Sequence, residues 1–585
     1  MLDIEFALAT DVVLDGGQAV CRQQTLGAPE DIADRNPGVA FINSAVSGVP
    51  TQAAIDACQP LNLFGSGSPS QAAIDYVSTQ TLSKNESSQL AYGAQFGGEL
   101  IEVPAGDILF SLQAEYRKEE NEFIPGEVFG NGLARNTQGR GSAGESEFTE
   151  WGVELSVPLF GGDFTFPGMQ RLVLDGAYRE VKRDSQGGPF NFSSSSNDSV
   201  FNVGTRYSPL EDVTIRASIS EAVRSPSIVE LFGAGVTGFS GLGRGNLNPC
   251  DADSIDGGPA GGIRRTNCEN FAVTLGLDPA TFLPTFQAPG GSAPAAGASN
   301  AGLENEKSKS WTAGVIYEPR FIDGLTLTLD YYEVDLEGEI GLTGLNFQCF
   351  DSETFPTEVI GGFDACNALI FAVEDTPGSG NFIVPAVNPV NGQPVDPIAN
   401  PGSPAQDNVP FTSTFSFFPT LNLGSTEVRS WYGTARYDFD LVDLLTLVDL
   451  PERDYGSVTL NASAYFLETF DDGNNPRAGE PGDPELSTVL QVTHQYNKLT
   501  HSLQWFRTSD VLENVLSTTP PLDQDVDFAR PEFNTFNYNA SYDLTDRWAL
   551  QFVVNNIFDE ELKPEGGLAG DTIGRRYVFG VRGRF

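Results

Sequence analysis

The sequence is poor in histidine, methionine and positive charge. Its 585 residues include two His, two Met and 33 Lys and Arg against 79 Asp and Glu, which gives a formal net charge of −46. Because nucleic-acid binders use positive charge to neutralise phosphates, this excess of acid excludes that class. With only His494 and His501 present and no Cys-x-x-Cys pair, we expect no metal site and no cofactor.

Long apolar runs are also missing. No stretch of 18 or more apolar residues occurs, so no transmembrane helix is expected. Hydrophobic residues nevertheless make up 40% of the chain and aromatic residues 11%, which is too much for a disordered protein. The 63 Gly and 37 Pro disfavour long helices. No catalytic nucleophile is recognisable, since Gly65-Ser66-Gly67-Ser68 lacks the Gly-x-Ser-x-Gly pattern, and we expect no enzyme activity.

The pattern that is present is an alternation of apolar and polar side chains. Residues 325–332 read Leu-Thr-Leu-Thr-Leu-Asp-Tyr-Tyr, which places apolar and polar side chains on opposite faces of a strand. This pattern predicts about 16 strands, near residues 2–10, 88–101, 107–119, 145–157, 169–181, 198–208, 212–222, 306–318, 323–334, 424–440, 455–471, 486–497, 499–508, 531–543, 546–556 and 573–585.

The predicted connections alternate between short and long. Short turns on one edge and long loops on the other are typical of an antiparallel transmembrane β-barrel, whereas a soluble sandwich has no reason to keep this parity. The short ones lie at 103–106, 208–211, 318–323, 497–498 and 544–546. The connections at 158–168 and 441–454 are of intermediate length and are assigned to the short-turn edge, because short and long connections alternate along the chain. The long ones lie at 11–87, 120–144, 182–197, 223–305, 335–423, 472–485, 509–530 and 557–572.

The polar faces favour a barrel that surrounds water. Charged and amide side chains recur on one face of nearly every strand, and so many of them would be costly in a small dry core. We predict that polar faces line a lumen and that apolar faces, such as that of Leu327, contact lipid. The alternative is a soluble propeller or solenoid, which no fixed repeat supports. Aromatic residues near strand ends fit the membrane interfaces: Trp151, Tyr178, Tyr207, Tyr317, Tyr331, Trp505 and Trp548.

Six cysteines fall into three local pairs within predicted loops. The pairs are Cys21 with Cys58, Cys250 with Cys268, and Cys349 with Cys366. An even number and a position in loops favour disulfides formed outside the cytosol. Six unrelated thiols are the alternative.

The last predicted strand ends on an aromatic residue. Tyr577, Phe579, Val581 and Phe585 occupy alternate positions of an amphipathic segment. Such an ending resembles the assembly signal of outer-membrane proteins, and an ordinary final strand is the alternative. By the loop parity this strand runs from the long-loop edge to the short-turn edge. The C-terminus is therefore expected in the periplasm and the long loops outside the cell.

Several segments, in this order, resemble TonB-dependent outer-membrane receptors. Residues 220–232, Ser-Glu-Ala-Val-Arg-Ser-Pro-Ser-Ile-Val-Glu-Leu-Phe, resemble the family's segment that leads from a strand into a loop. Residues 300–311, Asn-Ala-Gly-Leu-Glu-Asn-Glu-Lys-Ser-Lys-Ser-Trp, resemble its Asn-x-x-Leu-x-x-Glu-x-Ser stretch, with Asn305 where Pro often stands. Similar segments at 58–76, 555–559 and 574–585 extend the resemblance over essentially the whole chain.

The resemblance implies a receptor β-barrel domain over residues 1–585, with about 16 strands of a family barrel of about 22. Residues 1–6 have neither the basic start nor the apolar core of a signal peptide. No TonB-contacting segment and no plug domain is recognisable. We therefore expect a partial barrel that is the carboxy-terminal part of a receptor.

The resemblance also implies a function in the outer membrane of a Gram-negative bacterium. That function is uptake of a scarce nutrient of the siderophore, cobalamin or oligosaccharide class, energised through TonB. The expected partners are outer-membrane lipid and lipopolysaccharide, the assembly machinery, a small nutrient ligand, and the TonB complex only through the plug. A passive porin-like channel and a surface adhesin without transport are the alternatives.

Ligand-binding residues are not identifiable from the sequence, although two groups of loop residues are candidates. Arg244, Arg264 and Arg265 form a small basic group. Loop aromatics could stack on a sugar or siderophore, but packing of the loops on themselves is the favoured interpretation: these are Phe239, Phe271, Phe282, Phe286, Phe347 and Phe350. The carboxylates of residues 251–256 lack the last Glu of an EF-hand, so a solvated loop face is favoured over a calcium site.

Overall fold

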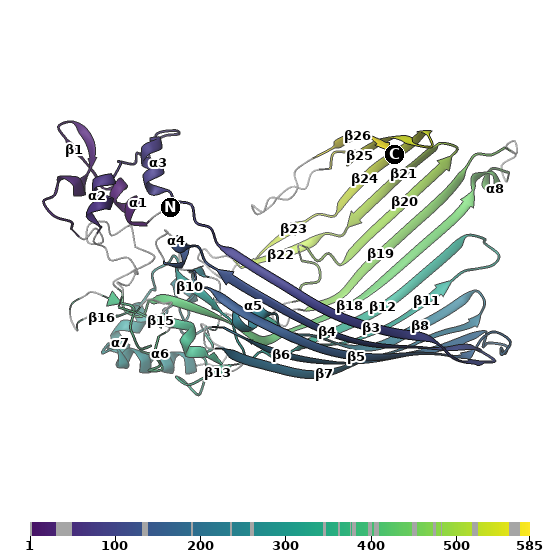
Figure 1. Cartoon of the computed structure of the whole chain (residues 1–585), viewed down its shortest axis with the longest axis horizontal. Helices are drawn as coiled ribbons and strands as arrows, with labels where there is room; N and C mark the ends of the chain where they lie inside the picture. Colours follow the sequence, from purple (N-terminus) through teal and green to yellow (C-terminus); the bar gives the residue numbers. More distant parts are fainter. Residues whose placement is uncertain are drawn as a thin grey trace.

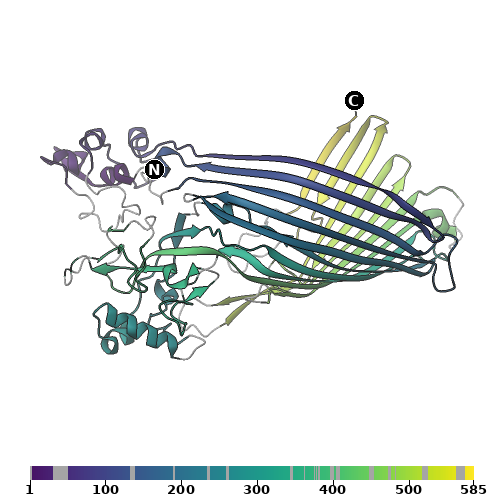
Figure 2. The ribbon, with the colours of Figure 1, turned by 60° about the horizontal axis from the view of Figure 1, so that its bottom comes forward.

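The structure is a computed structural model that describes residues 3–30, 50–131, 139–188, 191–233, 237–257, 262–342, 345, 347–360, 363–374, 376, 379, 382–395, 401–402, 409–446, 453–471, 476–480, 482–516, 525–560 and 574–584. Its main feature is one strongly curved antiparallel sheet whose strands pair in chain order (Figures 1 and 2). Among the described residues, no helix is both long and apolar enough to cross a membrane.

Fifteen of the 16 predicted strands are present in this sheet, so the predicted fold class, an antiparallel partial β-barrel, is confirmed. They are β3 (Lys84–Val103), β4 (Gly106–Ile124), β5 (Ser142–Phe160), β6 (Arg171–Gly187), β7 (Phe192–Leu210), β8 (Val213–Arg224), β11 (Glu306–Tyr317), β12 (Leu325–Leu342), β18 (Ser413–Asp440), β19 (Ser457–Asp471), β20 (Leu486–Tyr496), β21 (Leu499–Thr508), β24 (Phe533–Thr545), β25 (Trp548–Asn555) and β26 (Arg576–Gly583).

The sheet has two free edges. In the part of the chain that the structure describes, β3 pairs only with β4 and β26 only with β25. Every residue of β3 from Lys84 to Glu102 is exposed, as expected of an edge strand with no neighbour on one side. The barrel is therefore partial, and its wall runs continuously from β3 to β26.

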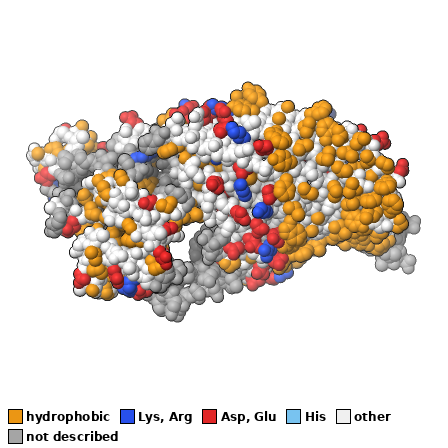
Figure 3. Space-filling view, turned by 90° about the horizontal axis from the view of Figure 1, so that it is seen from below, with side chains coloured by type: hydrophobic (Ala, Val, Ile, Leu, Met, Phe, Trp, Pro, Cys, Tyr) orange, Lys and Arg blue, Asp and Glu red, His pale blue; other side chains and the backbone are white. Residues whose placement is uncertain are grey.

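The outer face of the sheet, formed by the apolar positions of each strand, is exposed. Phe96, Leu329 and Phe579 are 68%, 46% and 77% exposed. Figure 3 shows this apolar surface as a broad band over the end of the barrel away from the long loops, beside a zone rich in charge. Trp311, Tyr331 and Trp431 touch one another across three strands of this face, with ring centroids 4.9 and 4.8 Å apart. Outward aromatics of this kind match those of membrane interfaces.

The two ends of the barrel differ as predicted. Short turns join β3 to β4 and β20 to β21, where Gly106 and Asn497 have positive φ. The other end carries the long connections and most of the helices (Figure 1). The prediction of a long loop at 182–197 is wrong. Strand β6 continues to Gly187 and strand β7 begins at Phe192, so the connection between them is short.

The predicted strand at residues 2–10 is wrong. Residues Asp3–Thr10 form the helix α1, in which Ala7, Leu8 and Ala9 are all buried. Three consecutive buried residues cannot share one face of a strand, whereas a helix in a small module can bury them together. This module also contains β1 (Val12–Asp15), β2 (Gln18–Cys21), α2 (Gln52–Ala57) and α3 (Gln71–Val77), which pack around the disulfide Cys21–Cys58.

Candidate functional site

The polar positions of the strands form the inner wall of the barrel, and on β4–β12 this wall is charged. Arg216 of β8 donates two hydrogen bonds to Asp330 of β12, with Nε–Oδ1 at 2.8 Å and Nη2–Oδ2 at 2.7 Å. The pair crosses Gly314 of the intervening strand β11, where a Cβ would collide with Asp330 Oδ1. Only glycine leaves room for this ion pair.

Other arginines of this wall are paired in the same way. Glu150, whose side chain is 6% exposed, pairs with Arg179 and lies 3.9 Å from Arg117. Arg206 Nη2 lies 3.2 Å from Asp175 Oδ2. We name the inner faces of β4–β8, β11 and β12 the charged wall, because several of its arginines are held by carboxylates of neighbouring strands.

The inner face of β19–β21, β24 and β25 is different, and we name it the uncharged wall. Its inward positions carry no charged residue within 457–469, 487–495, 500–508, 533–541 and 549–555. Four amides lie directly opposite one another on adjacent strands and form an amide row: Asn461, Gln491, Gln504 and Asn537. The next row toward the turns holds hydroxyls and one amide: Thr459, Thr493, Ser502 and Asn539.

Aromatic residues lie on the inner wall just above the amide row, toward the long loops. Tyr432 of β18 is directly opposite Tyr465 of β19 and is 40% exposed. The rings of Tyr465 and Tyr332 have their centroids 6.3 Å apart. Phe506 of β21 also faces inward. Along the strands it lies between the level of these tyrosines and the level of the amide row.

A shared ion-pair network joins the two segments that resemble receptor motifs. Arg224, at the end of β8, donates from Nε and Nη2 to Glu306 at 2.5 and 2.7 Å. The same guanidinium donates to both carboxylate oxygens of Glu230 at 3.2 Å. Glu306 is 6% exposed and also accepts from the Ile340 amide at 2.7 Å. The network therefore holds the start of the loop at 223–305 and its end together.

Between these ends, the helix α5 (Ile228–Phe232) folds onto the inner wall. Ser227 and Glu230 cap its first turn reciprocally. Leu231 and Phe232 are buried with Leu303. A Cβ on Gly144 or Gly187 would lie 2.9 Å from the Phe232 ring, so these glycines make room for it. Burial acts to raise the pKa of Glu230, but hydrogen bonds from Arg224 and Ser227 outweigh burial and hold that pKa below its usual value.

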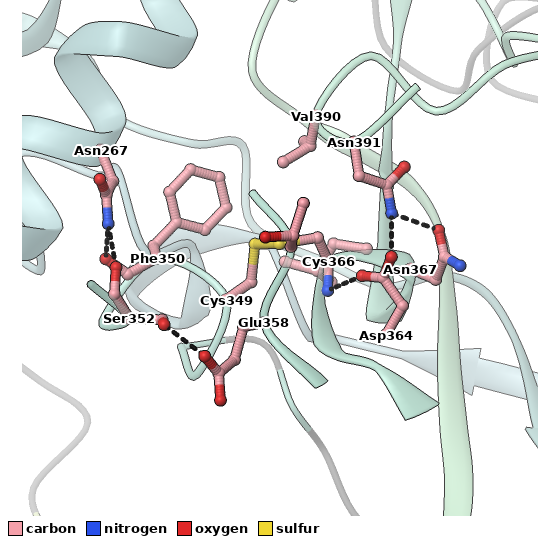
Figure 4. Close-up of a disulfide and its surroundings, with 12 residues drawn as sticks. Asn267, Cys349, Phe350, Ser352, Glu358, Asp364, Cys366, Asn367, Val390 and Asn391 are labelled. Carbon is pink, nitrogen blue, oxygen red and sulfur yellow. Dashed lines mark hydrogen bonds between the residues drawn. A yellow bond between two sulfur atoms is a disulfide. The ribbon is translucent and has the colours of Figure 1, made fainter. Parts of the chain in front are cut away.

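The loops at 223–305 and 335–423 pack together into one module at the long-loop end. It contains α6 (Ile263–Thr274), α7 (Pro279–Phe282), β9 (Thr237–Ser240), β10 (Ala293–Ala298) and β15 (Leu369–Phe371) around a common core. The expected disulfides Cys250–Cys268 and Cys349–Cys366 are present and buried in this core. Figure 4 shows Asn267 of α6 donating to the carbonyl oxygens of Phe350 and Ser352 next to the second disulfide.

Most of the aromatic ligand candidates are part of this core. Phe271, Phe286 and Phe350 are 1%, 5% and 1% exposed, and Phe271 lies 5.9 Å from Phe350, between ring centroids. Phe282 stacks on Phe286. Packing of the loops on themselves, the favoured interpretation, is therefore confirmed for these residues. Phe239 differs, because it is 43% exposed.

The three arginines of the predicted basic group do not form a free basic site. Arg264 pairs with Asp351 at 2.6 and 2.7 Å, and Arg265 pairs with Asp256. Arg265 lowers the pKa of Asp256 through this hydrogen-bonded pair. Arg244 is 3% exposed and donates to the carbonyl oxygens of Ser413 and Gly290. The prediction of a basic ligand cluster is wrong because each guanidinium already holds the loops together.

The remaining candidates lie elsewhere. His494 and His501 are close as expected, with Nδ1 and Nε2 3.0 Å apart, on the outer face near the short turns. Asp251 is buried and accepts from the amides of Asp253 and Ala288, so it is a loop-bracing residue rather than part of a solvated face. Tyr577, Phe579 and Val581 point outward from β26, while Phe585 lies outside the described residues. Their role as an assembly signal stays a prediction.

The amide row and the ion-pair network were not anticipated from the sequence. Strand alternation assigns each of these residues to the polar face but gives no register between strands. A hollow of about 270 Å³ on the wall of β3–β6 was also not anticipated, and its lining includes Gln95, Gln113, Glu115, Glu150 and Arg179. The one sequence signal for the network was the position of Arg224, Glu230 and Glu306 within the two segments that resemble receptor motifs.

A family model described as "TonB dependent receptor-like, beta-barrel" matches residues 51–557. No curated protein matches the chain.

Three similar solved structures are each 12% identical to this chain. The siderophore receptor PirA from Acinetobacter baumannii has a TM-score of 0.43, with 88% of this chain and 64% of that chain covered. The unliganded ferric citrate transporter FecA has a TM-score of 0.45, with 86% and 55% covered. The FrpB iron transporter from Neisseria meningitidis has a TM-score of 0.45, with 86% and 56% covered. The chain thus spans less than two thirds of the length of these structures.

Proposed function

Because this chain belongs to the TonB-dependent receptor family, whose β-barrel model it matches over residues 51–557, we propose that it supplies barrel wall and ligand-binding loops to an outer-membrane transporter. The transporter takes up a scarce nutrient with energy delivered through TonB. The coupling passes through a plug domain, and this chain contributes to the barrel domain.

The single observation that carries this proposal, beside the family, is the division between the two faces of the sheet. Apolar side chains such as Leu329 and Phe96 are exposed on the outer face, where water would make them costly and lipid would not. Ion pairs, amides and hydroxyls occupy the opposite face, where a water-filled lumen hydrates them. A soluble protein would place these faces the other way round.

The proposal assigns an orientation to the chain. The module formed by the loops at 223–305 and 335–423 faces the outside of the cell and contacts the nutrient, and the short turns and C-terminus face the periplasm. The charged zone above the apolar band contacts lipopolysaccharide. The outward side chains of Tyr577, Phe579 and Val581, with Phe585, contact the assembly machinery.

The test is a deletion of this gene in strains with and without TonB. We expect the deletion to slow growth when iron, cobalamin or an oligosaccharide is limiting, and only in the strain that has TonB. The intact chain, supplied from a plasmid, should restore growth and appear in the outer-membrane fraction. A growth defect that is equal without TonB would indicate a passive channel and overturn the proposal. A chain that fractionates with soluble protein would overturn it as well.

A further inference from the structure

The two largest loops offer no free cation to an anionic ligand. Residues 343–412 contain no Lys, Arg or His but eight Asp and Glu. Residues 225–305 contain only three basic residues, Arg244, Arg264 and Arg265, and all three are bound to carboxylates or carbonyl oxygens within the module. An anion entering here would meet uncompensated carboxylates and no guanidinium fork to bind it.

The charged wall does not compensate for this lack. Arg216, Arg179 and Arg206 face the lumen, but each is paired with a carboxylate of a neighbouring strand. An anionic ligand would have to compete with these carboxylates for the guanidinium groups. These three pairs therefore weaken the attraction of the wall for a negatively charged solute.

The uncharged wall has groups that are free to bind. Its amide row contains few mutual hydrogen bonds, and the one between Asn537 and Gln504 is long, at 3.5 Å, although Asn537 Oδ1 also accepts from the Asn556 amide at 2.9 Å. Each amide has two donors and an acceptor, the set that complements a hydroxyl group. Neighbouring strands lie about 4.8 Å apart, so successive amides of the row repeat at nearly the length of one pyranose unit.

The aromatic residues above the row complete the surface. Tyr432 is 40% exposed on the inner wall and lies directly opposite Tyr465. An exposed aromatic ring beside an uncharged hydrogen-bonding surface suits a ligand with an apolar ring face and a polar rim. A sugar ring has both.

We propose that the uncharged wall binds a neutral, polyhydroxylated ligand of the oligosaccharide class, with the amide row Asn461, Gln491, Gln504 and Asn537 along its length and Tyr432 against a ring face. This inference rests on the proposed function and narrows its substrate. It excludes an anionic metal chelate as the solute.

Calorimetry with the full chain in detergent tests the inference. The neutral probes are xylohexaose, cellohexaose and maltohexaose, and the anionic probes are hexagalacturonate and ferric citrate. At least one neutral hexasaccharide should bind, and neither anion should. Gln504→Leu and Tyr432→Ala should each weaken the binding about fivefold, because a bound hydrogen bond or ring contact contributes roughly 1 kcal/mol. Thr488→Val, on the lipid side of β20, is the matched control and should bind as the parent does.

The outcomes separate this inference from the function beneath it. Tighter binding of an anion than of every neutral probe would overturn the inference, as would failure of all three neutral probes to bind. Unchanged affinity in both Gln504→Leu and Tyr432→Ala would also overturn it. TonB-dependent uptake of ferric citrate would leave the proposed function standing and remove the assigned substrate class alone. Circular dichroism of each variant establishes that its sheet has formed.

Discussion

The charged wall and the uncharged wall belong to one sheet and face the same lumen, yet their polar groups are used differently. On the charged wall, Arg216 and Asp330 satisfy each other across Gly314. On the uncharged wall, the hydrogen bond that Gln504 accepts from Asn537 is long, at 3.5 Å. A polar surface is available to a ligand only where its groups have not already bound one another.

The walls also differ in what holds them in shape. The network of Arg224, Glu230 and Glu306 fixes the loop at 223–305 to the charged wall, with Phe232 packed beside Gly144 and Gly187. The uncharged wall is held by backbone ladders, with β20 joined to β19 and β21 over ten residue pairs each. We therefore expect side-chain substitutions to destabilise the first wall more than the second.

The largest effect on assembly is expected when a charged residue is placed on the lipid-facing side of the sheet rather than on either inner wall. Leu327→Arg should reduce the fraction of chain assembled in the outer membrane, because an arginine at the bilayer midplane costs about 2–4 kcal/mol. Thr328→Arg on the next residue faces water and should assemble nearly as the parent does. Heat-modifiable gel migration of the membrane fraction measures both variants. Equal losses would mean that the two faces have been assigned the wrong way round.

The second-largest effect, a loss of folding free energy, is expected from a substitution in the network of Arg224, Glu230 and Glu306. Glu306→Ala removes the carboxylate to which both Arg224 and the Ile340 amide donate hydrogen bonds. Breaking a buried ion pair costs 3–5 kcal/mol, but Arg224 is 48% exposed, so we expect about 2 kcal/mol. Urea unfolding in detergent and the rate of proteolysis of the loop at 223–305 measure the loss. A loop as protease-resistant as the parent's would contradict the role of the network.

Acidification should destabilise the packing of α5 on the inner wall. This effect should be reversible and smaller than that of Glu306→Ala. The folded pKa of Glu230 lies below its ordinary value of 4.5. Its contribution to stability is therefore complete above about pH 4.5 and is lost as the pH falls through the lowered pKa. The hydrogen-exchange protection factors of residues 228–232, measured between pH 6 and pH 3, should decrease once the pH is below 4.5. Glu230→Gln cannot ionise and should show no such step, whereas a step of equal size in this variant would assign the titration to another group.

The smallest effect on stability is expected in the amide row. Gln491 donates one long hydrogen bond, to Thr493 Oγ1 at 3.3 Å. Gln491→Leu should therefore cost less than about 1 kcal/mol, while removing one ligand contact. The same urea titration as for Glu306→Ala measures it. A loss as large as that of Glu306→Ala would mean that the uncharged wall is as dependent on its side chains as the charged wall.

Strand positions were predictable because lipid on one side and water on the other impose alternation on each strand separately. Fifteen strands followed from this rule, including β26 with Tyr577 and Phe579. The rule failed at residues 3–10, because a small disulfide-linked module surrounds α1 with protein instead of two solvents. It also ended β6 too early and began β7 too late, since these strands extend beyond the apolar band into water.

By itself the sequence determined the class of fold, the parity of turns and loops, the local disulfide pairs and the lack of basic residues in the loop at 343–412. These properties depend on neighbours along the chain or on composition. Only the tertiary structure decided that Arg224 joins Glu230 to Glu306, that Arg264 is neutralised by Asp351, and that four amides form one row. Register between strands and packing between loops bring together residues far apart in the chain, and alternation carries no information about either.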